Sequence, residues 1–165
     1  MGIDASLTNT GVAIVRNAEL TAMSYEPKKL RGSERLVWFR DNLRGLIMTR
    51  GPDLVVIEGY AFGAKMQREA MGELGGTIRV LLHDLNVPYI VIPPTSLKLF
   101  ITGIGNGPKD NMSKEIYKRF DVDLTDNNQI DAAGLAIMGL ASDREGAQTD
   151  FPLTEFQKRA LSKIE

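Results

Sequence analysis

MGIDASLTNTGVAIV (residues 1–15) places one carboxylate, Asp4, at the end of a short apolar run. A turn-forming stretch from Ser6 to Gly11 follows, and a second apolar run, Val12–Val15, comes after it. Two apolar runs separated by turn residues predict the first hairpin of a β-sheet. Because a carboxylate is costly to bury in a strand unless it is paired or binds a metal, we expect Asp4 to belong to a functional site.

A second acid ends a second predicted strand. Residues 54–57 (LVVI) form a continuous apolar run, which is typical of a strand covered on both faces, and Glu58 follows them. Glu58 is therefore predicted at the carboxyl end of a strand, the edge of an open α/β sheet where active sites gather. A single acid at this point is equally consistent with a strand end that is exposed to solvent, since acids are mostly exposed. Together with Asp4, it favours a shared site.

The third acid lies in residues 126–138 (DNNQIDAAGLAIM), where polar residues lead into an alanine-rich apolar helix. Either Asp126 or Asn127 is expected to cap this helix. Asp131 then lies in its early turns, on the same face as Asn128 three residues before it. Small residues after Asp131 should let the helix approach the sheet closely, which would bring its carboxylate toward the first two acids. The alternative is an acid favoured only by the positive amino end of the helix.

Three carboxylates without cysteine or histidine favour a hard cation such as Mg²⁺ or Mn²⁺ and disfavour zinc. Two such ions about 4 Å apart can activate an attacking water and stabilise the leaving oxygen in phosphodiester hydrolysis, and they offset the repulsion between the acids. The pattern therefore predicts a nuclease. Actin-like phosphotransferases use a similar Asp-containing hairpin to hold nucleotide phosphates, but the second phosphate-binding hairpin and the larger adenosine pocket that they need are not evident in this sequence.

These motifs together resemble the RuvC family of Holliday junction resolvases, in the short form often encoded by bacteriophages. The resemblance spans most of the chain and rests on the following segments: GID (2–4), TNTG (8–11), VIE (56–58), FGAK (62–65), GIG (103–105) with Lys109, IDAA (130–133) and LAI (135–137). It implies an α/β, ribonuclease-H-like fold with a mixed five-stranded sheet flanked by helices. It also implies a homodimer that nicks two strands of a four-way DNA junction symmetrically, leaves 5′-phosphates and depends on a divalent metal.

Carried over to this sequence, the resemblance implies that Asp4, Glu58 and Asp131 hold two Mg²⁺ ions, for which Mn²⁺ can substitute. Asp4 is similar to the ligand that both ions share. Lys109 is similar to a basic residue that supports DNA binding and transition-state charge. Phe62, or Tyr60 in its place, resembles the aromatic residue that the family inserts near the junction crossover.

The chain departs from the family pattern one turn before the helix acid, where a further acid is usual and this sequence has Asn127 and Asn128. Asn128 can still offer a carbonyl oxygen to a metal or to its water, whereas Asp126 reaches the site only if the helix begins later than predicted. The asparagine therefore favours a catalytically silent junction-binding module as one alternative function. A nuclease that also cuts flaps or forks is a second alternative, which the sequence does not separate from a resolvase.

Composition bounds the remaining possibilities. The chain has 165 residues, which is the size of a single domain, and its formal net charge is −1, so it lacks the basic excess common in nucleic-acid-binding proteins. Acids in a metal site are neutralised by the ions, so the local distribution of charge matters more than the total. There is no cysteine and no apolar segment near the roughly 20 residues that cross a bilayer. We expect a cytoplasmic protein without a membrane partner.

Basic residues fall into two groups. Lys65 and Arg68 flank the predicted site and are expected to contact DNA phosphates, with an affinity that falls as salt rises. Between Lys28 and Arg50 there are seven basic residues and two acids, but apolar residues at helical spacing predict that most of these charges lie on a solvated helix face.

A long helix is predicted from about Lys65 to Leu85, with Val80 among its buried positions. Gly75 and Gly76 lie at its middle, where each glycine costs roughly 1 kcal/mol relative to alanine. We therefore expect a close contact at the two glycines, either a dimer seam or a tight crossing against the protein's own sheet.

Overall fold

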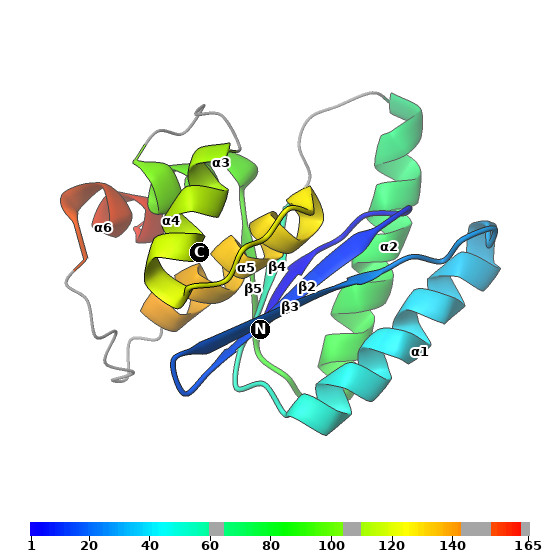
Figure 1. The fold of residues 1–165 in the computed structure, drawn as a ribbon. Helices are drawn as coiled ribbons and strands as arrows, with labels where there is room; N and C mark the ends of the chain where they lie inside the picture. The colour runs from blue at the N-terminus through cyan, green and yellow to red at the C-terminus, as the bar shows by residue number, and fades with distance from the viewer. Residues whose placement is uncertain (60–64, 104–109, 143–152, 163–165) are drawn as a thin grey trace.

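The computed structural model describes residues 1–59, 65–103, 110–142 and 153–162, without the side chains of residues 65–68 and 110. Within these residues one mixed sheet has the strand order β3-β2-β1-β4-β5 (Figure 1). Its strands are β1 (Gly2–Asp4), β2 (Thr10–Arg16), β3 (Glu19–Tyr25), β4 (Val55–Glu58) and β5 (Tyr89–Ile92). Neighbouring pairs are antiparallel for β1–β2 and β2–β3 and parallel for β1–β4 and β4–β5. The predicted mixed five-stranded sheet is confirmed.

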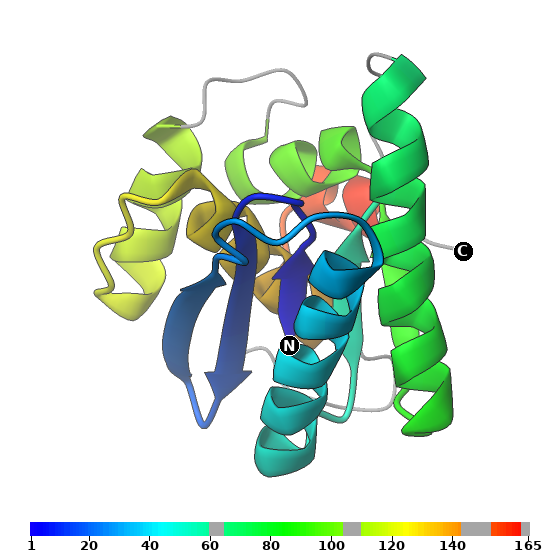
Figure 2. The same ribbon diagram turned by 90° about the vertical axis from the view of Figure 1, so that its right-hand side faces the viewer.

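Helices cover both faces of the sheet, as Figures 1 and 2 show from two directions. One face carries α1 (Gly32–Arg50) and α2 (Lys65–Asp84). The other face carries α5 (Asn127–Ser142), beyond which lie α3 (Pro94–Thr102), α4 (Asp110–Phe120) and α6 (Glu155–Leu161). Each face buries its own hydrophobic cluster, because strand side chains alternate between the two sides.

The face beneath α1 and α2 is built from apolar residues at helical spacing. On α1, Phe39, Leu43 and Ile47 are buried four residues apart and point toward the sheet. Across from them, Leu74 and Ile78 of α2 are fully buried in the same cluster. Most charged residues of α1, Arg40 among them, are exposed, as the apolar spacing predicted, whereas Arg35 and Arg44 are half-buried.

Glycines let α5 lie directly on the strands of the opposite face. A Cβ at Gly2 would lie 2.1 Å from the backbone oxygen of Ala132, and a Cβ at Gly11 would lie 2.0 Å from that of Asn128. From the helix side, a Cβ at Gly139 would lie 2.5 Å from a methyl carbon of Val56. Only residues without side chains fit at these contacts, so the expected close approach of this helix to the sheet is confirmed.

The prediction for the middle of α2 is wrong in one respect. A Cβ at Gly76 would have no described atom within 4 Å, so Gly76 makes no tight crossing against the sheet. Val80, predicted to be buried, is 61% exposed. Both residues lie on the side of α2 that faces away from the cluster formed by Leu74 and Ile78. None of the described helices combines the length and the apolarity needed to cross a membrane.

A candidate metal centre at the edge of the sheet

Strand pairing brings the first two predicted acids together. Ile3 of β1 pairs with Ile57 of the parallel strand β4, so the residues that follow them, Asp4 and Glu58, end neighbouring strands at the same edge of the sheet. Ile3 and Ile57 both pack in the cluster beneath α1 and α2. Since successive side chains point to opposite faces, Asp4 and Glu58 point to the face that carries α5.

The third acid comes from α5 itself. Asp131 is 4% exposed and Asp4 is 7% exposed, while Glu58 is half-buried. One carboxylate oxygen from each of these three residues lies within 4.8 Å of the other two. The structure therefore joins the three acids that the sequence analysis selected, from two strands and one helix, in one cluster.

The geometry of this cluster fits a hard divalent cation. Mg²⁺ binds oxygen ligands at about 2.0–2.1 Å in an octahedron, so opposite ligands lie about 4.2 Å apart. At most one pair of three ligands can be opposite, and adjacent ligands lie about 3 Å apart, so oxygens within 4.8 Å of one another bind a common ion after the side chains close around it. Carboxylate oxygens are the donors that Mg²⁺ and Mn²⁺ prefer, and the cluster offers no thiolate or imidazole that would select zinc.

Asp126 caps α5. One of its carboxylate oxygens, Oδ1, accepts hydrogen bonds from the backbone N–H groups of Asn128 (2.8 Å) and Gln129 (3.2 Å). The other, Oδ2, accepts from Asn9 Nδ2 (2.8 Å) and from Ser24 Oγ (3.1 Å). Burial alone would raise the pKa of Asp126, but these hydrogen bonds together lower the pKa below its usual value. Of the two predicted caps, Asp126 is therefore the one observed, and its carboxylate lies outside the acidic cluster.

Asn128 lies close to the strands that carry the cluster. Its backbone is packed against Gly11, which is the residue paired with Asp4 across β1 and β2. Helical spacing puts Asn128 on the same face as Asp131, three residues later. The placement is compatible with an amide oxygen near the metal centre, and ligation by Asn128 stays a prediction.

Several predicted site residues fall outside the described part of the chain. They are Tyr60, Phe62 and Lys109, together with the side chains of Lys65 and Arg68. Their expected contacts with DNA stay predictions.

Two features of this edge were missed from the sequence. The first is the hydrogen-bond network around Asp126, although an acid followed three residues later by Gln129 is a known signal of a helix start. The second is the loop after β3: Tyr25 ends β3 at the edge of the sheet where the acids lie, so exposed Lys28 and Lys29 follow it at that edge. That placement follows from strand direction, which the sequence alone left open.

Comparison with known proteins gives a consistent result. No family model matches the chain. The crossover junction endodeoxyribonuclease RuvC of Parasynechococcus marenigrum (strain WH8102) is 25% identical over 150 residues, covering 84% of this chain and 96% of that protein. The protein of the same name from Synechococcus sp. (strain CC9902) is also 25% identical over 150 residues, with the same coverage of 84% and 96%.

Solved structures share the fold. RuvC of T. thermophilus in complex with a Holliday junction substrate matches with a TM-score of 0.72 and 17% identity, covering 82% of this chain and 88% of that chain. The Fowlpox virus resolvase in complex with Holliday junction DNA matches with a TM-score of 0.56 and 18% identity, covering 86% of this chain and 97% of that chain.

The strand order, the helices on both faces and the cluster of carboxylates at the sheet edge define a ribonuclease-H-like protein with an acidic centre. Within that class, the chain is similar over most of its length to the RuvC crossover junction endodeoxyribonucleases named above.

Proposed function

We propose that this protein is a metal-dependent endonuclease that resolves four-way DNA junctions by paired, symmetrical nicks that leave 5′-phosphates. The observation that carries the proposal is the cluster of Asp4, Glu58 and Asp131 within 4.8 Å, at the sheet edge of a fold shared with RuvC. The relatives named as crossover junction endodeoxyribonucleases cover most of this chain, which supports the same activity here.

In this proposal, Asp4, Glu58 and Asp131 hold two Mg²⁺ ions, or Mn²⁺ in their place, and Asn128 supplies a further oxygen. Bound ions would supply Lewis acidity and an activated water for hydrolysis of the phosphodiester. Asp4 lies on the central strand of the sheet, between β2 and β4, which suits a ligand shared by both ions. The burial of Asp4 and Asp131 keeps their carboxylates from swinging into solvent, so the chain holds the ligands in place before the metal arrives.

The proposed DNA path runs along the same edge. Lys28, Lys29 and Arg31 are exposed on the loop between β3 and α1, and no ion pair joins them to a carboxylate among the described residues. Free cations beside an acidic centre suit phosphates that flank the cleaved bond. We include Lys65, Arg68 and Lys109 in this DNA surface, with Tyr60 and Phe62 near the junction crossover.

Symmetrical nicking needs two active sites, so we propose a homodimer. The outer side of α2 supports this assembly: a Cβ at Gly72 or Gly76 would meet nothing described within 4 Å, and Val80 is 61% exposed. Residues four apart share one helix face, so these three positions form a stripe where a second helix can approach closely. Gly76→Arg should lower the dimer fraction in sedimentation velocity, whereas a wild-type chain that stays monomeric at high concentration would contradict the assembly.

We further propose that the enzyme works in the bacterial cytoplasm, where branched DNA arises, and that it is of the bacteriophage type.

The function is tested with a labelled four-way junction, a matched duplex and a matched flap, each incubated with and without Mg²⁺. Glu58→Gln is the control, because it removes a charge from the centre while keeping the size of the side chain. Paired nicks in the junction alone, abolished by the substitution, are the expected result. Equal cutting of the flap would favour a broader branched-DNA nuclease, and tight junction binding without metal-dependent cutting would favour a silent binding module.

A further inference from the structure

Asp126 joins three segments of the chain that are far apart in sequence. It caps α5 through the backbone N–H groups of Asn128 and Gln129, and it accepts hydrogen bonds from Asn9 in the β1–β2 loop and from Ser24 in β3. A cap alone would need only the first pair of contacts. The second pair fastens the start of the helix to the sheet.

The network closes on itself. Gln129 Nε2 donates to Ser24 Oγ at 2.9 Å, and Ser24 Oγ donates to Asp126 Oδ2 at 3.1 Å. Ser24 pairs with Gly11, and Gly11 pairs with Asp4, so Ser24 lies in the same row of the sheet as the first acid of the metal centre. The helix start is therefore tied to the row that carries Asp4.

Steric contacts alone do not fix the position of the start of α5 on the sheet. The close contact between Gly11 and the backbone of Asn128 limits how near α5 comes to the sheet, and the apolar core beneath α5 is not directional, so neither fixes the exact position of the helix start as hydrogen bonds do. Hydrogen bonds from the β1–β2 loop and from β3 resist movement of the helix start along the sheet and away from it. Asp131 lies five residues after Asp126, about 7.5 Å along the helix axis, so a shift at the helix start is passed on to its carboxylate.

From this geometry we propose that Asp126 is a positioning residue for the metal centre: its contacts with Asn9 and Ser24 place α5 so that Asp131 meets Asp4 and Glu58. The inference rests on the proposed function in that it takes the acidic cluster to bind a divalent ion. Asp126 itself is not one of the three clustered acids.

The test is the affinity for Mn²⁺ and Mg²⁺, measured by calorimetric titration without DNA, in the wild-type chain and in Asp126→Ala. Removal of the carboxylate frees the helix start, so we expect affinity to fall about 10-fold or more, the usual effect of losing a group that orients a metal ligand. Hydrogen exchange provides a readout that does not involve metal: amides at the start of α5 should exchange faster in Asp126→Ala.

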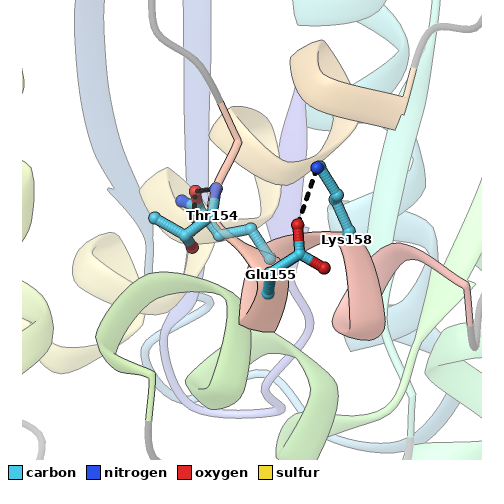
Figure 3. Close-up of polar contacts among 4 residues, drawn as sticks. Thr154, Glu155 and Lys158 are labelled. Atoms are coloured by element: carbon cyan, nitrogen blue, oxygen red, sulfur yellow. Dashed lines mark hydrogen bonds and ion pairs between the residues drawn. The ribbon is translucent and has the colours of Figure 1, made fainter.

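A matched control separates positioning from a general loss of stability. Thr154 caps α6, where Gln157 Oε1 accepts from Thr154 N at 3.0 Å and from Thr154 Oγ1 at 3.1 Å (Figure 3). Helix α6 packs against α3, away from the acids. Thr154→Ala should lower the melting temperature as a lost helix cap does and leave metal affinity unchanged. An equal loss of affinity in both alanine variants would overturn the proposal.

A conservative variant separates geometry from charge. In Asp126→Asn, the side-chain amide can donate to Asn9 if the Asn9 amide rotates, because Asn9 Oδ1 is buried without a hydrogen-bond partner among the described residues. We expect this variant to keep metal affinity within about threefold of wild type. A fall as large as that of Asp126→Ala would mean that charge, not position, matters, and wild-type affinity in Asp126→Ala would also overturn the inference. A wild-type chain that binds neither ion would instead refute the proposed function.

Discussion

Gly11 leaves no room for a side chain between β2 and α5. In Gly11→Ala, the new Cβ would lie 2.0 Å from the oxygen and 2.3 Å from the carbon of the Asn128 carbonyl. Ordinary contacts of a Cβ begin near 3.4 Å, so the gap must open by about 1.4 Å. Both obstructing atoms are backbone atoms, and no rotamer change relieves the clash. The start of α5 must therefore move off the sheet.

This movement would separate the acids. Gly11 is paired with Asp4, and Asn128 is three residues before Asp131, so the displaced contact lies between two members of the proposed centre. Overpacking of this kind typically destabilises a protein by about 1–3 kcal/mol. A misplacement of about 1 Å at a reacting group can lower a rate about 100-fold. We expect junction cleavage to fall by about that factor while the protein stays folded.

The assay is single-turnover cleavage of the four-way junction, well below the melting temperature, with thermal unfolding followed in parallel. Gly45→Ala is the matched control, because Gly45 is exposed on α1 and a Cβ there would meet no described atom within 4 Å. Replacing a glycine inside a helix should raise stability by roughly 0.5–1 kcal/mol without altering cleavage. A Gly11→Ala protein that cuts at the wild-type rate would refute the reasoning.

Three further predictions concern the core, the DNA surface and an ionisable group. Phe39 is fully buried, so Phe39→Ala should lower the free energy of unfolding by about 3–5 kcal/mol in urea denaturation. Replacing both Lys28 and Lys29 with glutamine should weaken junction binding in fluorescence anisotropy and reduce the slope of log affinity against log salt by roughly 2, whereas an unchanged slope would remove this loop from the DNA path. Burial raises the pKa of Tyr25 above its usual value of 10.0, although Arg50 opposes the shift. The stabilising effect of the buried, neutral Tyr25 phenol is complete below the unfolded pKa and is lost as pH rises through the folded pKa. Tyr25→Phe should therefore remove a late step in phenol absorbance at alkaline pH. An unchanged titration would contradict this.

The acidic cluster could be predicted from the sequence because three acids, each ambiguous alone, have local patterns that place them at the same edge of a sheet. Asp4 and Glu58 end short apolar runs that are typical of strands, and Asp131 follows a polar helix start. Strand ends and the early turns of a packed helix meet at one edge in a sheet with helices on its faces. The cluster therefore follows from local patterns combined with one rule about sheet edges.

Contacts that depend on relative placement were harder to predict. The network of Asp126 with Asn9 and Ser24 links residues more than 100 positions apart, and no local pattern selects those partners. At Gly76 of α2, by contrast, a close contact against the protein's own sheet was one expectation, and the structure does not have it. A glycine inside a helix indicates a contact or an open face equally well, and at Gly76 the structure shows an open face.

The central claim is that Asp4, Glu58 and Asp131 form a divalent-metal centre. The most direct test is a crystal of the protein grown or soaked with Mn²⁺, with the ions located by their anomalous scattering. We expect anomalous peaks about 2.0–2.2 Å from oxygens of these three residues, and loss of the peaks in Glu58→Gln. Peaks elsewhere on the protein, with none at the cluster, would contradict it.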